Sequence, residues 1–159
     1  MNIIGLGAPG CQIANNFNEW PQYNVLCIDI QDRGYTNFIP VKEQETHEDY
    51  EKDFTLLEIK KLSGPIVLFI CGGSAISGMS LKFLEEFKDT ELTIFYIKPD
   101  MSSSSSQHKI RHKITFGVLQ QYARSNMFTR IFIVDNKNVE SILENISIAD
   151  YWKNINNAI

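Results

Sequence analysis

Short, largely apolar stretches recur along the chain, and each is followed by glycine, proline or polar residues. Such runs are typical of strands buried on both faces of a parallel sheet. We predict strands at residues 2–6, 23–30, 66–71, 92–97 and 130–134, with a loop or short edge strand at 34–40. The run at 66–71 gives the strongest strand signal, because it contains no polar residue before Cys71.

The segments between these strands have helical spacing or breaker residues. At 11–20, for example, Ile13, Ala14, Phe17 and Trp20 fall on one side of a helix. We predict helices at 11–20, 54–62, 81–87, 108–125, 139–143 and 148–159, and a flexible surface loop at the serine-rich residues 101–107. Alternating strands and helices predict a three-layer, doubly wound, parallel α/β sheet of Rossmann-like type. No linker divides the chain, so we expect a single domain over residues 1–159.

Composition narrows the class of protein. The chain has 159 residues, 43% of them apolar, and a net charge of -4, which argues against a dedicated nucleic-acid surface. The apolar run at 65–71 is too short to cross a bilayer, so we expect no membrane association. The three cysteines and three histidines show no metal-binding spacing, and no metal site is predicted. With no signal peptide visible, we expect a cytoplasmic protein.

Two glycine loops follow predicted strands. Gly5 to Gly10 fits G-x-G-x-x-G, a pattern that lets backbone N–H groups at a helix start approach a phosphate. Asp29, at the end of the next strand, would suit a ribose hydroxyl. The loop at 71–78 stands in the same context after the third strand. The alternatives without a ligand are a tight turn at the first loop and a helix cap by Ser74 or Ser77 at the second.

The motifs in chain order resemble those of the tubulin and FtsZ GTPases. The first loop is similar to the family's Gly-Gly-Ala-Gly-Cys/Gly-Asn, and residues 72–78 resemble a worn form of its signature Gly-Gly-Gly-Thr-Gly-Thr/Ser-Gly. Weaker likenesses are Ile97-Lys98-Pro99, the basic helix start at 113–116 and the strand that ends at Asn136. Residues 146–156 resemble Ile-Ser-Leu-Leu-Asp-Ala-Phe-Gly-Ala-Ala-Asn and give the best match.

The resemblance implies a guanine-nucleotide site, with GTP or GDP as ligand and Mg²⁺ accompanying GTP. The first phosphate loop would comprise Gly7, Ala8, Gly10, Cys11 and Gln12. The second would comprise Gly72, Gly73, Ser74, Ala75, Ser77 and Gly78, with Lys113 at the following helix start. Asn136 and Asn156 would read the guanine edge, and Trp152 would lie against its face. The alternatives are that Trp152 anchors the last helix and Asn156 is a solvated surface residue.

Several departures from the family pattern predict a weakened phosphate site. Ser74, Ala75 and Ile76 replace two glycines and a hydroxyl residue of the signature. The segment 42–53, where the family has another glycine-rich loop, carries six acidic residues, which would repel phosphate unless they point elsewhere. The acidic ribose contact of the family falls on Lys109.

The chain stops inside the helix that, in the family, leads to a catalytic acidic loop and a second domain. We therefore expect little or no GTPase turnover and name no catalytic residue. Two alternative functions stay open. One is a nucleotide-free structural or interaction module, such as part of a phage or filament-associated assembly. The other, ranked lower, is an NAD-type Rossmann domain.

The last helix also suggests a protein partner. Tyr151, Trp152, Ile155 and Ile159 are apolar at roughly helical spacing, and the family packs this helix between two domains. We expect part of this surface to be exposed and to form a homo-oligomer or a complex with another protein. The alternative is that these side chains fold back onto the sheet.

Overall fold

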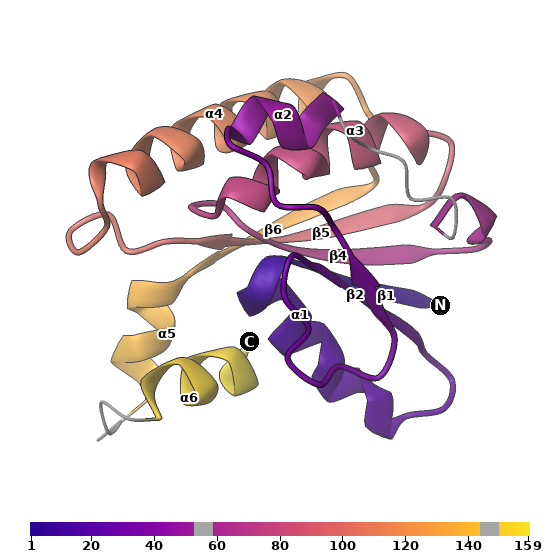
Figure 1. Cartoon of the computed structure of the whole chain (residues 1–159), viewed down its shortest axis with the longest axis horizontal. Coiled ribbons are helices and arrows are strands. Elements are labelled where there is room, and N and C mark those ends of the chain that lie inside the picture. The colour runs from indigo at the N-terminus through magenta and orange to yellow at the C-terminus, as the bar shows by residue number, and fades with distance from the viewer. Residues whose placement is uncertain (53–58, 144–149) are drawn as a thin grey trace.

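Six parallel strands form one sheet. The computed structural model describes residues 1–52, 59–143 and 150–159. The strands are β1 (Asn2–Leu6), β2 (Asn24–Asp29), β3 (Phe38–Pro40), β4 (Ile66–Cys71), β5 (Leu92–Lys98) and β6 (Arg130–Asp135). Their order is β3-β2-β1-β4-β5-β6, and every neighbouring pair is parallel (Figure 1). This confirms the predicted Rossmann-like α/β class.

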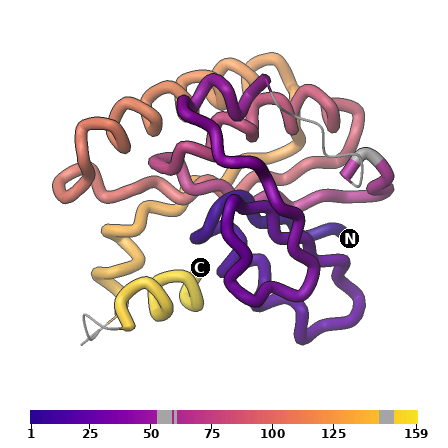
Figure 2. Tube along the Cα trace, in the orientation of Figure 1, coloured from indigo at the N-terminus to yellow at the C-terminus, as the bar shows by residue number. Residues whose placement is uncertain are grey.

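Helices cover both faces of this sheet. One face carries α2 (His47–Lys52), α3 (Met79–Glu86) and α4 (Ser106–Arg124), and the other carries α1 (Gly7–Asn15), as Figure 1 shows. The chain ends on the α1 side with α5 (Asn136–Ile142) and α6 (Tyr151–Ala158) (Figure 2). Three short 3₁₀ helices, at Asn16–Glu19, Ile59–Lys61 and Ala75–Gly78, complete the described elements.

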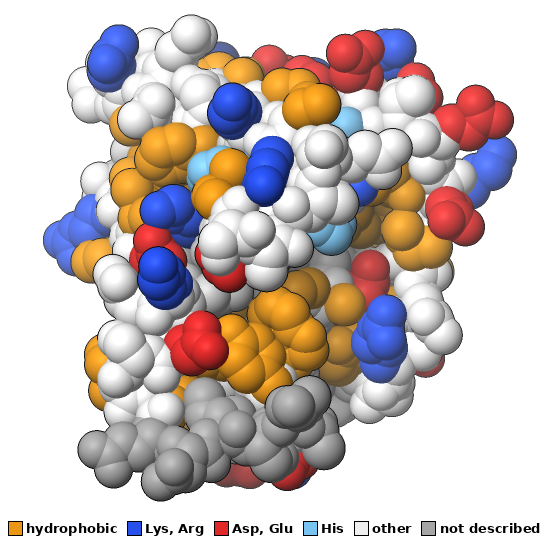
Figure 3. All heavy atoms as spheres, turned by 90° about the vertical axis from the view of Figure 1, so that its left-hand side faces the viewer, with side chains coloured by type: hydrophobic (Ala, Val, Ile, Leu, Met, Phe, Trp, Pro, Cys, Tyr) orange, Lys and Arg blue, Asp and Glu red, His pale blue; other side chains and the backbone are white. Residues whose placement is uncertain are grey.

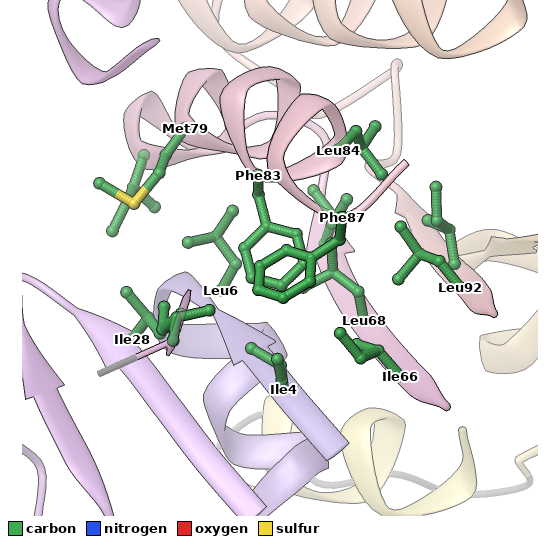
Figure 4. Close-up of a cluster of buried hydrophobic side chains, with 14 of the residues drawn as sticks. Ile4, Leu6, Ile28, Ile66, Leu68, Met79, Phe83, Leu84, Phe87 and Leu92 are labelled. Atoms are coloured by element: carbon green, nitrogen blue, oxygen red, sulfur yellow. The ribbon is translucent and has the colours of Figure 1, made fainter. Parts of the chain in front are cut away.

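The larger part of the core lies between the sheet and the α3 face. Alternate residues of β1 and β4, among them Ile4, Leu6 and Leu68, meet Phe83 and Phe87 there (Figure 4). The residues between them along the same strands, such as Ile3 and Phe69, form a second cluster with α1. Burial on both faces explains why β1 and β4 read as continuous apolar runs.

Helix α6 corrects one prediction. Ile155 is fully buried and Ile159 packs against the cluster under α1, so this side of the helix completes the core. Ile155 is therefore not an exposed interface residue as expected, whereas a protein partner or second copy bound through the rest of this helix stays a prediction. Trp152, in contrast, is 60% exposed.

Several boundaries differ from the sequence predictions. The first helix begins at Gly7 and tightens into a 3₁₀ turn after Asn15, which leaves Trp20 46% exposed. The serine-rich loop ends early, because the Ser105 hydroxyl accepts a hydrogen bond from the His108 N–H at 3.3 Å and caps α4. Most of the predicted helix at 54–62, residue Asp53, and positions 146–149 of the C-terminal motif lie outside the described residues.

Candidate nucleotide-binding site

A cavity of about 760 Å³ lies at the carboxyl ends of the strands. Figure 3 views this face, where hydrophobic side chains gather in the middle among acidic and basic ones. The lining residues follow five of the six strands and continue onto α6. They are Ala8, Pro9, Gln12, Arg33, Tyr35, Cys71, Gly73, Ser74, Pro99, Asp100, Ser103, Ser104, His108, Asn136, Glu140, Tyr151, Trp152 and Asn156.

The first glycine loop is a strand-to-helix turn at Gly7. Its φ of 73° is a left-handed conformation that glycine adopts without strain, and it lets α1 begin directly after Leu6. Ala8, Pro9 and Gln12 line the cavity. Gly10 instead faces the sheet, since a Cβ there would lie 2.6 Å from the Phe69 carbonyl oxygen.

Cys11 also points away from the cavity. Its thiol lies 3.3 Å from the carbonyl oxygens of both Gly5 and Ile28, which share its single S–H donor, and the residue has no exposed surface. The neighbouring Cys27 thiol and burial raise the pKa of Cys11, so it stays a protonated thiol. Cys11 therefore fastens α1 to the sheet rather than facing a ligand.

The second glycine loop is satisfied largely within the protein. Gly72 and Gly78 leave no room for a side chain, because the Tyr96 hydroxyl and the His47 carbonyl occupy those positions. The buried Ser77 hydroxyl donates to the Ser74 carbonyl at 2.7 Å and lies 3.2 Å from His47 Nε2. Of this loop's predicted ligand contacts, Gly73 and Ser74 line the cavity.

Ile76 of the second loop packs against Gly7 of the first loop. It is 3% exposed, and a Cβ on Gly7 would lie 2.8 Å from its Cγ2 atom. The branched side chain therefore occupies space between the loops and packs into the core rather than lining the cavity.

Four polar or aromatic residues at the end of β6 and on α6 also line the cavity: Asn136, Tyr151, Trp152 and Asn156. Asn136 follows β6, is 5% exposed, and has a buried Oδ1 atom that accepts no hydrogen bond from the described residues. The Asn156 Nδ2 donates to Gln12 Oε1 at 2.7 Å, which ties α6 to α1. The Trp152 and Tyr151 rings meet edge to face, with centroids 5.1 Å apart.

The structure thus brings some of the predicted site residues together and separates others. Seven line the cavity: Ala8, Gln12, Gly73, Ser74, Asn136, Trp152 and Asn156. Eight do not: Gly7, Gly10, Cys11, Gly72, Ala75, Ser77, Gly78 and Lys113. Lys113 is exposed on α4, next to the inward-facing His112.

Sequence reasoning missed other lining residues, among them Arg33, Tyr35, Asp100, His108 and Glu140. Their shared signal is position, since Arg33, Asp100 and Glu140 follow within five residues of a strand end. Hydrogen bonds from Ser102 and Ser103 lower the pKa of Asp100 to about 2, so it is ionised at neutral pH.

Acidic residues 42–52 do not line the cavity. Glu43, Glu45 and Glu48 are exposed, and Asp49 accepts a hydrogen bond from the Thr46 hydroxyl at 2.6 Å. Across the described ranges, no three His, Cys, Asp or Glu side chains are grouped as metal ligands would be. Within the same residues, no helix has both the length and the apolar character needed to cross a bilayer.

Comparison with known proteins supports the fold through structural similarity rather than sequence similarity. No protein-family model matches the sequence, and no curated protein does so. Among solved structures, the empty FtsZ dimer of M. jannaschii matches 98% of this chain with a TM-score of 0.78 and 12% sequence identity. The chain spans half the length of that FtsZ chain. Six parallel strands in this order, with helices on both faces, therefore give the protein an FtsZ-like fold.

Proposed function

We propose that the cavity binds a guanine nucleotide, GTP or GDP, through a weakened phosphate site and with little or no hydrolysis. One observation carries the proposal: a single cavity collects residues from the ends of five strands and from α6, and one of them is Asn136, whose buried Oδ1 atom has no hydrogen-bond partner among the described residues. A buried polar atom without a partner is costly, so a donor from a ligand at that point would stabilise the site.

The size and chemistry of the cavity suit a nucleotide. Its volume of about 760 Å³ falls in the usual range for small-molecule sites. Guanine carries two hydrogen-bond donors, the N1–H and the exocyclic amino group. The Asn136 amide oxygen and the Glu140 carboxylate are acceptors that can receive hydrogen bonds from them. The exposed Trp152 ring offers an aromatic face on the same side.

The phosphate side is weaker than the base side. Backbone N–H groups at the start of α1 are suited to an anion, and the first turn of that helix carries no acidic residue. In the second loop, by contrast, Ser77 is hydrogen-bonded internally and Ile76 packs against Gly7. The described residues offer no carboxylate cluster, so we propose that Mg²⁺ binds chiefly through the phosphates of GTP.

Calorimetric titration with GTP, GDP, ATP and NAD tests the proposal. We expect guanine nucleotides to bind more tightly than ATP, and Asn136→Ala to reduce that preference. Asn138→Ala, an exposed neighbour that does not line the cavity, is the matched control. Equal affinity for GTP and ATP would contradict guanine recognition.

A second candidate is a nucleotide-free interaction module inside the cell. The internal satisfaction of the second loop favours it, since Gly72, Ser77 and Gly78 need no phosphate to explain them. The FtsZ match is a dimer, and self-association of this chain is proposed on that ground. A folded protein that binds none of the four nucleotides and sediments as a dimer would favour this candidate.

A further inference from the structure

The segment after β2 forms one wall of the cavity. Arg33 and Tyr35 line it from this segment, and the Tyr35 hydroxyl donates to the Ala8 carbonyl at 3.4 Å. The segment is therefore fastened across the first turn of α1. Neither side chain belongs to the glycine loops or to the residues expected to contact guanine.

Arg33 forms an ion pair with Asp29. The Asp29 side chain is 8% exposed, and its Oδ2 lies 3.8 Å from Arg33 Nε. Its other carboxylate oxygen accepts a hydrogen bond from the Ile30 N–H at 2.8 Å. Burial raises the pKa of Asp29, and the Arg33 charge opposes that shift.

The Arg33 guanidinium has donors to spare. It carries five N–H groups, and Asp29 faces the Nε side alone. Among the described residues, no hydrogen bond engages the terminal nitrogens of a side chain that is half-exposed at the cavity wall. A guanidinium whose terminal N–H groups are free can donate two parallel hydrogen bonds to the oxygens of a phosphate.

Charge is distributed unevenly along the cavity. Arg33 follows β2, whereas Asp100 and Glu140 follow β5 and β6. In the strand order, β2 and β6 are four spacings of about 4.8 Å apart, or about 19 Å. Within the described lining, Arg33 is the one lysine or arginine, and both carboxylates lie toward the other end.

We propose that Arg33, together with the first turn of α1, forms an anion subsite for the phosphate groups of the bound nucleotide. The assignment of these phosphates to a guanine nucleotide rests on the proposed function. Arg33 supplies a cation beside the first loop. In the second loop, Ser74 and Ile76 stand where the similar family signature has glycines. The ligand then lies with phosphates toward Arg33 and with its hydrogen-bond donors toward Asp100 and Glu140.

The test compares ligands that differ in phosphate content. Guanosine, GMP, GDP and inorganic pyrophosphate are titrated calorimetrically into the wild-type protein, Arg33→Gln and Asp29→Asn/Arg33→Gln. The double variant avoids an unpaired buried carboxylate, and circular dichroism checks that both variants fold. Arg130→Gln is the matched control, because Arg130 is exposed at the start of β6, on the sheet edge opposite the cavity.

We expect both Arg33 variants to lose at least tenfold in GDP affinity while guanosine affinity stays within twofold, with Arg130→Gln like wild type. Unchanged GDP affinity in the Arg33 variants, or equal wild-type affinity for guanosine and GDP, overturns the subsite but leaves guanine binding intact. If no nucleotide binds, the proposed function fails. Pyrophosphate binding that Arg33→Gln abolishes would then still support the subsite, and absence of pyrophosphate binding would overturn it.

Discussion

Gln12 and Asn156 are 144 residues apart in the sequence, and their side-chain amides are hydrogen-bonded at 2.7 Å. Gln12 lies on α1, the helix of the first glycine loop, and Asn156 lies on α6, the last described helix. Both residues line the cavity, so the bond links the two helices at the cavity wall. Asn156 is only 3% exposed. Removal of one partner leaves the other without a hydrogen bond in a partly buried position.

Asn156→Ala is therefore expected to lower the free energy of unfolding by about 1–2 kcal/mol. Urea unfolding monitored by circular dichroism measures the change. Asn154→Ala is the control, since Asn154 is exposed on the same helix and should cost less than about 0.5 kcal/mol. Equal effects of the two substitutions would show that the buried bond adds nothing.

Trp152→Ala should separate binding from stability. The side chain is 60% exposed, so the unfolding free energy should change by less than about 0.5 kcal/mol. Loss of an aromatic face against a base should weaken guanine-nucleotide binding by about 1–3 kcal/mol in a calorimetric titration. Trp20→Ala, at a residue that is 46% exposed and outside the cavity, should leave affinity unchanged. A Trp152→Ala variant with wild-type affinity would remove Trp152 from the site.

Ile155→Glu tests the packing of α6. Because Ile155 is fully buried, a carboxylate there would be desolvated without a partner, and the unfolding free energy should fall by about 3 kcal/mol or more. Lys153→Glu changes the charge at an exposed position of the same helix and should be tolerated. A folded Ile155→Glu variant, detected by a wild-type thermal midpoint, would mean that α6 does not complete the core.

Stability should fall as the pH drops below about 6.5. Burial lowers the pKa of His47, and the positive charge of Arg111 lowers it further. Burial also lowers the pKa of His112, and the positive charge of Lys98 acts in the same direction. The unfolded chain therefore takes up protons first, so stability is complete above the unfolded pKa and is lost as the pH falls through the folded values. Urea midpoints between pH 7.5 and 5.5 measure the slope, which His47→Gln should reduce. A midpoint that is independent of pH over this range would contradict the prediction.

Purified protein should release no phosphate from GTP above background. Among the described lining residues, those that follow β1, β2 and β4 include no carboxylate and no histidine, so the loops proposed to hold the phosphates supply no general base of their own. A colorimetric phosphate assay checks this, with active FtsZ as the positive control. Hydrolysis that rises with protein concentration would instead indicate a site formed between subunits.

The sequence predicted the sheet better than the site. Apolar runs such as that of β4 are read directly, because both faces of a central strand are buried. Placement of Arg33 depends on a loop held by Asp29 and Tyr35, and no periodic pattern records such contacts. Lys113 faces solvent because the buried face of α4 runs through His112 and Thr115. The glycines were informative about backbone contacts, but Gly72 and Gly78 owe their identity to Tyr96 and His47.

The position of β1 has a consequence for how the chain acquires its structure during synthesis. Strand β1, which is synthesised before the other five strands, pairs with β2 on one side and with β4, some sixty residues later, on the other. Its apolar residues stay without their second partner until Ile66–Cys71 has emerged. Parallel pairings between distant segments form slowly, so a chain arrested before residue 71 should be a substrate for chaperones and proteases.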